Sequence, residues 1–351
     1  MVGRLVGTYA FCHLAVDFAC ISTMLCMVVP ALGDAGFPTA AGAIVAYDMF
    51  AFALQLPIGA ALDGHASGTR AALLSYALIA LGIIGTYLPG SLAAPIPVML
   101  AAVGNALFHC AGGVDVLAIS HGKAAPSGLF ISTGALGVFF GTRASSLFGS
   151  MLHGVLLALL LVSALQTAGL IHPEAHEEKR TLMRPQPSKA AAAAAALLAL
   201  TVALRSYTGM IMAFPWKGAF ALALISVCAV VAGKAMGGII ADTIGPGRAS
   251  TISLGISAPL FLLAHDLPAA GIIATLLFNF TMPITLISLA ELLPRNRGLA
   301  FGIASFSLAI GAFPTFVGIR PAGGAVLAAL SLVSLACLLA GLALARSSFH
   351  A

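Results

Sequence analysis

The stretch Gly59-Ala-Ala-Leu-Asp63, followed by Gly68-Thr-Arg70, has a counterpart in the second half of the chain. There Gly238-Ile-Ile-Ala-Asp242 is followed by Gly245-Pro-Gly-Arg248. In both copies a glycine stands four residues before an aspartate, at the end of an apolar run. Such a glycine lets two helices approach closely, and the aspartate can accept hydrogen bonds from the N-terminus of a neighbouring helix. The repetition indicates a chain built from two similar halves.

A second pair of matches follows the first pair in the same order. Leu107-Phe108-His109 precedes Gly128-Leu129 as Leu277-Phe278-Asn279 precedes Gly298-Leu299, with equal spacing in both halves. Internal repeats of this kind are common in secondary transporters. The only sustained polar segment lies between the two sets of matches. We therefore predict three parts, an N-terminal six-helix bundle at 1–171, a cytoplasmic linker at 172–189 and a C-terminal six-helix bundle at 190–351.

The composition places most of the chain in a membrane. Of its 351 residues, 60% are hydrophobic and only 8% are charged, whereas a soluble protein carries about 25% charged residues. A helix needs about 20 apolar residues to cross a bilayer. The sequence predicts an all-α membrane protein of twelve transmembrane helices in two pseudo-symmetric six-helix bundles. The predicted helices span about 5–30, 39–62, 70–89, 95–119, 127–149, 152–171, 190–213, 217–241, 249–265, 268–291, 298–318 and 322–346.

The basic residues in the loops predict the orientation. If the N-terminus is cytoplasmic, the outer loops receive only Lys217 and Arg320, and most other lysines and arginines fall on the cytoplasmic side. This is the bias of the positive-inside rule, and it explains the net charge of +5 without a nucleic-acid partner. We expect a multi-pass protein of the bacterial cytoplasmic (inner) membrane with both termini in the cytoplasm. The cytoplasmic set is Arg4, Arg70, Lys123, Lys179, Arg180, Arg184, Lys189, Arg248, Arg295, Arg297 and Arg346.

Several functional classes have no support in the sequence. The six cysteines lie in apolar runs without a Cys-x-x-Cys spacing, so we interpret them as small hydrophobic residues and expect no metal site. The chain has no phosphate-binding loop and no His-Glu-x-x-His motif. We expect no cofactor and no enzymatic activity. The expected partners are a small-molecule substrate, protons and the lipid bilayer, and the expected state is a monomer.

The repeated glycine–aspartate pattern resembles the loop signature of the major facilitator superfamily. That signature joins the second and third helices and often recurs between the eighth and ninth. Here Gly64 stands where a basic residue is usual. The resemblance implies a twelve-helix transporter that works by alternating access. The residues that match the signature, or that lie where they can pair with its arginines to form a gate, are Gly59, Asp63, Arg70, Asp115, Gly238, Asp242, Arg248 and Glu291.

The predicted helix at 127–149 contains regularly spaced glycines and Arg143. The spacing of Gly128, Gly137 and Gly141 is similar to the fifth-helix signature of proton-coupled drug antiporters in this superfamily. That signature continues with Gly-Pro and Gly-Gly, where this chain has Gly141-Thr142 and Ser145-Ser146. The glycines suit close packing of this helix on a neighbour. An ordinary glycine-rich helix interface remains the alternative.

A narrower resemblance concerns the first and fourth predicted helices. His13-Leu-Ala-Val-Asp17 and Gly104-Asn-Ala-Leu-Phe-His109 are similar to segments of the fosmidomycin-resistance-type branch of the superfamily. In that branch the Phe-His pair usually continues with Pro-Glu, whereas Cys110-Ala111 follow here. The acidic group of that motif is therefore missing from this chain.

Superfamily architecture places the first, fourth, seventh and tenth helices around a central cavity, and each of them carries a polar group here. His13 and Asp17 are four residues apart and share one helix face, as do Asn105 and His109. An ionisable residue within the membrane is by default a functional hypothesis. We predict Asp17, assisted by His13, as the proton-coupling carboxylate, with Asp48 as a second candidate. The predicted substrate-cavity residues are Asn105, His109, Arg143, Arg205 and Asn279.

Two further interpretations concern cations within the predicted helices. Arg143 and Arg205 are either counter-charges to Asp17 or Asp48, or binding groups for an anionic part of the substrate. Lys234 is expected to snorkel towards the cytoplasmic interface. The alternative for all these groups is that they form satisfied polar pairs that set helix register.

The sequence as a whole predicts a secondary active transporter. We expect proton-coupled efflux of a small compound, anionic or amphipathic, by alternating access. A proton-coupled importer of a small nutrient is the first alternative. The second is a transporter-like protein that senses a ligand or moves lipid without coupled transport.

Overall fold

The computed structural model describes residues 2–33, 37–65, 68–88, 94–170 and 188–349. Within these ranges all regular secondary structure is helical, which confirms the all-α prediction. Eleven helical segments among them are long and apolar enough to cross a membrane. The remaining predicted span, 249–265, is also helical, but Arg248 and several hydroxyl residues make it less apolar. The chain is a multi-pass membrane protein.

The first six spans are interrupted more often than the sequence predicts. The first span contains a π-helical turn, and the second and fifth each break once near the middle. The elements are α1 (Val2–Thr23), η1 (Met24–Val28), α2 (Val29–Ala31), α3 (Phe37–Ala53), α4 (Gln55–His65), α5 (Gly68–Gly85), α6 (Pro95–Ser120), α7 (Ala124–Ser132), α8 (Gly134–Gly141), α9 (Ala144–Phe148), η4 (Gly149–Met151) and α10 (Leu152–Ala168).

The last six spans begin at Lys189, one residue before the predicted boundary. Ser188 caps the first of them, because its hydroxyl accepts a hydrogen bond from the Ala191 amide at 3.1 Å. The predicted linker otherwise lies outside the described residues. The elements are α11 (Lys189–Ile211), η5 (Pro215–Gly218), α12 (Phe220–Ile244), α13 (Pro246–Leu263), α14 (Pro268–Phe278), α15 (Thr281–Leu292), α16 (Arg297–Phe316) and α17 (Gly324–Phe349).

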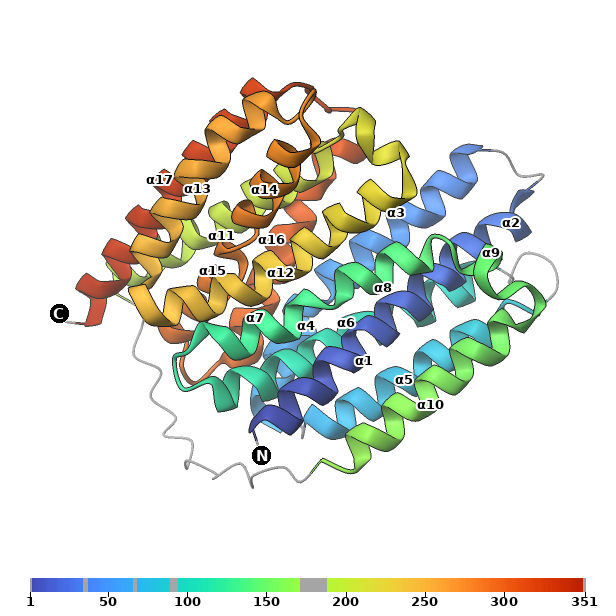
Figure 1. Ribbon diagram of the computed structural model, residues 1–351. Helices are drawn as coiled ribbons and strands as arrows, with labels where there is room; N and C mark the ends of the chain where they lie inside the picture. Colours follow the sequence, from blue (N-terminus) through green and yellow to red (C-terminus); the bar gives the residue numbers. More distant parts are fainter. Residues whose placement is uncertain (1, 34–36, 66–67, 89–93, 171–187, 350–351) are drawn as a thin grey trace.

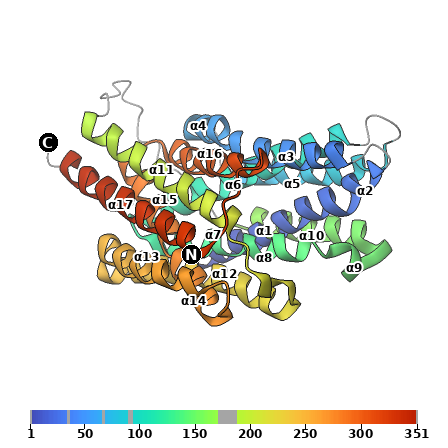
Figure 2. The same ribbon diagram turned by 90° about the horizontal axis from the view of Figure 1, so that it is seen from above.

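The helices gather into two groups that lie side by side (Figures 1 and 2). In the first group α5 packs on α6, and α1 packs on α6, α8 and α10. In the second group α11 packs on α16 and α17, and α13 packs on α14 and α17. Two seams join the groups, one between α12 and the pair α7 and α8, and the other between α4 and α16. Residues at these seams can therefore link the two groups.

The fifth span ends earlier than predicted, and this changes the position of Arg143. α8 ends at Gly141, and the next apolar span begins at Ala144. The placement of Arg143 within a helix at 127–149 is therefore wrong, because the residue lies in the break between two spans. Its guanidinium donates to the Phe139 carbonyl at 3.1 Å and the Thr142 hydroxyl at 2.8 Å, and lies 4.1 Å from the centre of the Phe139 ring.

Candidate functional site

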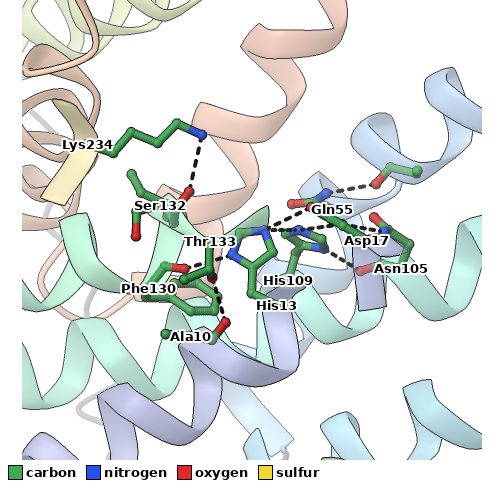
Figure 3. Close-up of polar contacts among 12 residues, drawn as sticks. Ala10, His13, Asp17, Gln55, Asn105, His109, Phe130, Ser132, Thr133 and Lys234 are labelled. Atoms are coloured by element: carbon green, nitrogen blue, oxygen red, sulfur yellow. Dashed lines mark hydrogen bonds and ion pairs between the residues drawn. The ribbon is translucent and has the colours of Figure 1, made fainter. Parts of the chain in front are cut away.

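Four polar side chains from α1 and α6 meet between the two helices (Figure 3). We call His13, Asp17, Asn105 and His109 the histidine–aspartate cluster. The Asp17 carboxylate lies 3.3 Å from Nε2 of His13 and 3.6 Å from Nε2 of His109, and it accepts a hydrogen bond from the Asn105 amide at 3.2 Å. The two histidine Nε2 atoms are 2.9 Å apart. The cluster thus unites residues that the sequence assigned to proton coupling and to the substrate cavity.

The hydrogen-bond partners of the two histidines suit a shared proton. Nδ1 of His13 contacts the Phe130 carbonyl at 2.8 Å, and Nδ1 of His109 contacts the Asn105 carbonyl at 2.9 Å. Since a carbonyl oxygen can only accept, each Nδ1 is placed to donate. With both Nδ1 atoms donating, a hydrogen bond between the two Nε2 atoms would need one more proton and would make one ring an imidazolium. The arrangement can therefore take up a proton beside the Asp17 carboxylate.

The cluster is largely shielded from solvent. The side chains of His13, His109 and Asp17 are 8%, 12% and 14% exposed. Aromatic rings surround His13, whose ring lies 5.1 Å from that of Phe130 and 6.2 Å from that of Phe108. Charges in such an environment are costly unless they are paired and hydrogen-bonded. The contacts of the Asp17 carboxylate with His13, His109 and Asn105 satisfy this requirement.

Glycines of α8 allow the close contact with α1 at the cluster. A side chain at Gly134 would collide with the Asp17 carboxylate and the His13 ring, and one at Gly137 would collide with the Leu14 carbonyl. Gly141 of α8 packs on Ile21 of α1. Gly128 instead faces α12, at the Lys234 carbonyl. The predicted glycines therefore pack the fifth span on two different helices, and Gly134, which the sequence analysis missed, lies nearest to the charges.

The ligand atoms of His13, Asp17 and His109 lie within 4.8 Å of one another, which is close enough to hold a metal ion. Two nitrogen ligands of a tetrahedral zinc, each about 2.0–2.1 Å from the metal, are about 3.3 Å apart. The two Nε2 atoms are closer, at 2.9 Å. That separation is typical of a hydrogen bond. A tetrahedral metal ion at this place would require the two imidazole rings to move slightly apart.

The second helix group contributes Lys234 of α12. Its ammonium donates to the Ile131 carbonyl of α7 at 3.2 Å and is close enough to interact electrostatically with Asp17 (Figure 3). The expectation that Lys234 snorkels towards the cytoplasmic interface is therefore wrong. The sequence signal for its role was present, because a lysine in an otherwise apolar helix is costly. The direction in which the lysine side chain points was not evident, because hydropathy does not encode how a helix is rotated about its axis.

A break in the fifth span receives hydrogen bonds from both helix groups. Thr133 separates α7 from α8, and its hydroxyl donates to the Ala10 carbonyl of α1 at 2.5 Å. Two consecutive carbonyls just before the break accept side chains from opposite groups, namely His13 at Phe130 and Lys234 at Ile131. The break thus links the cluster in the first group to a cation in the second.

The remaining predicted residues lie apart from the cluster. Within the described ranges Asp48 has no hydrogen bond or ion pair, and no carboxylate lies within ion-pair distance of Arg143. The structure does not bring Arg143 to Asp17 or Asp48. Arg205 is buried, and its guanidinium lies 5.4 Å from the centre of the Phe278 ring. Asn279 donates to the Thr275 carbonyl of its own span, at the break between α14 and α15.

The signature aspartates cap helices of the opposite group. Asp63 accepts hydrogen bonds from the amides of Gly298 and Leu299 at 2.7 and 2.8 Å, at the start of α16. Asp242 accepts from the amides of Ala124 and Ala125 at 2.7 and 3.0 Å, at the start of α7. Neither helix has a side-chain cap of its own. Each carboxylate therefore supplies a cap and ties one seam.

Asp63→Ala should loosen the seam between α4 and α16. Cys110 reports on this seam, because its thiol is buried 3.3 Å from the Gln55 carbonyl, against which Gly302 of α16 also packs. Loss of two capping hydrogen bonds costs about 1–2 kcal/mol, so we expect maleimide to modify Cys110 about 5- to 30-fold faster. Site-resolved mass spectrometry measures the rate relative to the wild-type protein labelled in parallel.

Asp266→Ala is the matched control for this experiment, because Asp266 is an exposed aspartate that interacts only with its neighbour His265 in the described structure. An unchanged Cys110 rate in Asp63→Ala would show that the cap contributes nothing to closure of the seam.

The predicted gate pairs Asp115 with Arg70 and Glu291 with Arg248 are seen only in part. Asp115 accepts a hydrogen bond from the Tyr9 hydroxyl at 2.6 Å and lies against Gly68, two residues before Arg70. In the described structure Glu291 makes no ion pair with Arg248. Arg248 instead lines a pocket of about 600 Å³ together with Arg346. The predicted pairing of Glu291 with Arg248 is therefore absent in this conformation.

No protein-family model matches the chain, and no curated protein matches it. Solved structures do match over nearly its whole length. The human organic anion transporter MFSD10 has a TM-score of 0.71 at 14% identity, covering 96% of this chain and 99% of its own. The E. coli fucose:proton symporter has 0.66 at 13% identity, covering 98% and 99%. A bacterial homologue of the iron transporter ferroportin, in an outward-facing state, has 0.63 at 12% identity, covering 100% and 99%.

These similarities concern the fold. They confirm that the chain has the major facilitator fold, which the loop signature had indicated. The named cargoes of the three proteins differ, so the fold leaves the substrate to be argued from the residues of this chain.

Proposed function

We propose that the protein is a proton-coupled secondary transporter that exports a small compound by alternating access. The observation that carries this proposal is the 2.9 Å contact between Nε2 of His13 and Nε2 of His109, because a shared proton fits between two imidazole nitrogens at this distance. Histidine is the side chain that changes charge in the physiological pH range. A shared proton beside a buried carboxylate is suited to reversible loading.

The position of the cluster suits coupling of protonation to movement. Asp17 lies on α1, directly against Gly134 of α8, so a change of its charge acts at a close helix contact. The same carboxylate interacts electrostatically with Lys234 of the opposite group. Loading or loss of the proton therefore changes the attraction between the two groups. A rearrangement between two conformations requires such a difference in interaction free energy between them.

The direction and location follow from the sequence and remain proposals. Efflux is supported by the spacing of Gly128, Gly137 and Gly141, which is similar to that of drug–proton antiporters. The positive-inside bias supports a bacterial inner-membrane protein with cytoplasmic termini. Import is the competing direction, and the E. coli fucose:proton symporter shares the fold.

Growth inhibition by a broad compound panel in an efflux-deficient bacterial host tests the direction. We expect expression of the wild-type protein to protect against at least one compound, because export lowers its internal concentration. Asp17→Asn at equal expression should remove the protection. Sensitisation of the host by the wild-type protein would instead indicate import. Growth unaffected by the wild-type protein across the whole panel would contradict export.

A further inference from the structure

Arg205 is a buried cation without a visible partner. It lies in the middle of α11, is 6% exposed, and its Nε is fully buried without a hydrogen-bond partner. No other guanidinium nitrogen of Arg205 is hydrogen-bonded within the described residues, and the centre of the Phe278 ring lies 5.4 Å from the guanidinium. An isolated charge in the membrane interior costs several kcal/mol. Such a residue is expected to meet an anion during the working cycle.

Lys234 places a second positive charge nearby. Arg205 lies by Phe278, and Gly233, the residue before Lys234, packs on Leu276 and Asn279 of the same span. The ammonium has one hydrogen bond, to the Ile131 carbonyl. In the described part of the chain no carboxylate lies within 4.0 Å of either cation. Asp17 is already engaged by two histidines and Asn105. The second helix group therefore has one buried and one partly buried positive charge that no acid of its described residues pairs with.

We propose that Arg205 and Lys234 bind a carboxylate or phosphonate group of the transported compound. This assignment of a substrate class rests on the proposed transport function. The planar guanidinium can donate two parallel hydrogen bonds to such a group, and the lysine adds a point charge. The Phe278 ring, which is buried in this conformation, provides an apolar neighbour beside the guanidinium. The anion and the proton then occupy opposite helix groups.

Binding to the purified full-length protein in lipid nanodiscs tests the site without any need for transport. The probes are phenylphosphonate and benzoate, with neutral benzamide and cationic benzylamine of similar size as controls. We expect at least one anion to raise the melting temperature in a saturable way, because a ligand of the folded state stabilises it. Benzamide and benzylamine should have no such effect.

The variants assign the effect to the two cations. Arg205→Gln should weaken anion affinity by about 30-fold or more, and Lys234→Gln by at least about tenfold, because each removes a buried charge partner. Arg205→Lys keeps the charge but loses the paired donors, so it should also bind about tenfold more weakly. Arg320→Gln is the matched control, since Arg320 is an exposed loop residue whose Nε donates to the Thr315 carbonyl.

Two results would overturn the anion site. One is that neither anion stabilises the wild-type protein, or that benzamide does so equally well. The other is that wild-type affinity persists in Arg205→Gln, or in Arg205→Lys if the glutamine variant does not fold. Asp17→Asn should retain anion binding in this assay, so failure of proton coupling and failure of the anion site are distinguishable.

Discussion

Asp17→Asn should abolish proton-driven transport while leaving substrate exchange at equal pH on the two sides. The amide is isosteric with the carboxylate and keeps a partner for Asn105, but it carries no charge to stabilise a proton taken up between His13 and His109. Protonation then no longer changes the attraction to Lys234. Coupling free energies between sites are typically about 1–3 kcal/mol, so the accumulation driven by a pH gradient should fall by about 100-fold.

Proteoliposomes loaded with a compound identified in the growth panel separate the two activities. Accumulation under an imposed pH gradient reports coupling, and exchange of labelled for unlabelled compound without a gradient reports binding and movement. Asp266→Asn is the matched control, because Asp266 is an exposed loop aspartate that interacts only with its neighbour His265 in the described structure. It should retain gradient-driven accumulation. Undiminished accumulation in Asp17→Asn would remove this carboxylate from the coupling mechanism.

Gly298→Leu should block closure of the seam between α4 and α16 and stop transport in a protein that still folds. A side chain at Gly298 would run into the Gly59 carbonyl, and a side chain at Gly59 would run into the Gly298 carbonyl. The backbone atoms at this contact cannot move aside in the way that a flexible side chain can. Overpacking a close contact costs about 1–3 kcal/mol, which moves a conformational equilibrium by about 5- to 150-fold.

Cys110 labelling and transport measured on the same variant test this prediction. We expect faster labelling together with loss of transport, since the seam spends less time closed. Gly255→Leu is the control, because Gly255 lies in a transmembrane helix with open space around it and an exposed surface. Normal transport by Gly298→Leu would show that this close approach is not needed for the cycle.

The candidate site could be predicted only in part. The i, i+4 pairs on α1 and α6 marked His13 with Asp17 and Asn105 with His109, because residues at that spacing share a helix face. That the two pairs face each other is a tertiary property. The same is true of Lys234, whose ammonium donates to the Ile131 carbonyl of α7 in the opposite group. Arg143 was misplaced because a helix break at Thr142 has no hydropathy signal.

The sequence by itself determined that the chain is all-helical, that most of its helices are long and apolar enough to cross a membrane, and which two aspartates can cap a neighbouring helix. These follow from local rules, since a backbone in lipid must satisfy its own hydrogen bonds and a span needs a minimum apolar length. Only the tertiary structure decided which helix faces meet, that two histidines contact each other beside Asp17, and that Arg205 and Lys234 lie at the same span of the second group. Helix rotation depends on close contacts between distant residues, such as Gly134 against Asp17 and Gly59 against Gly298. The order of residues along the chain does not reveal those contacts.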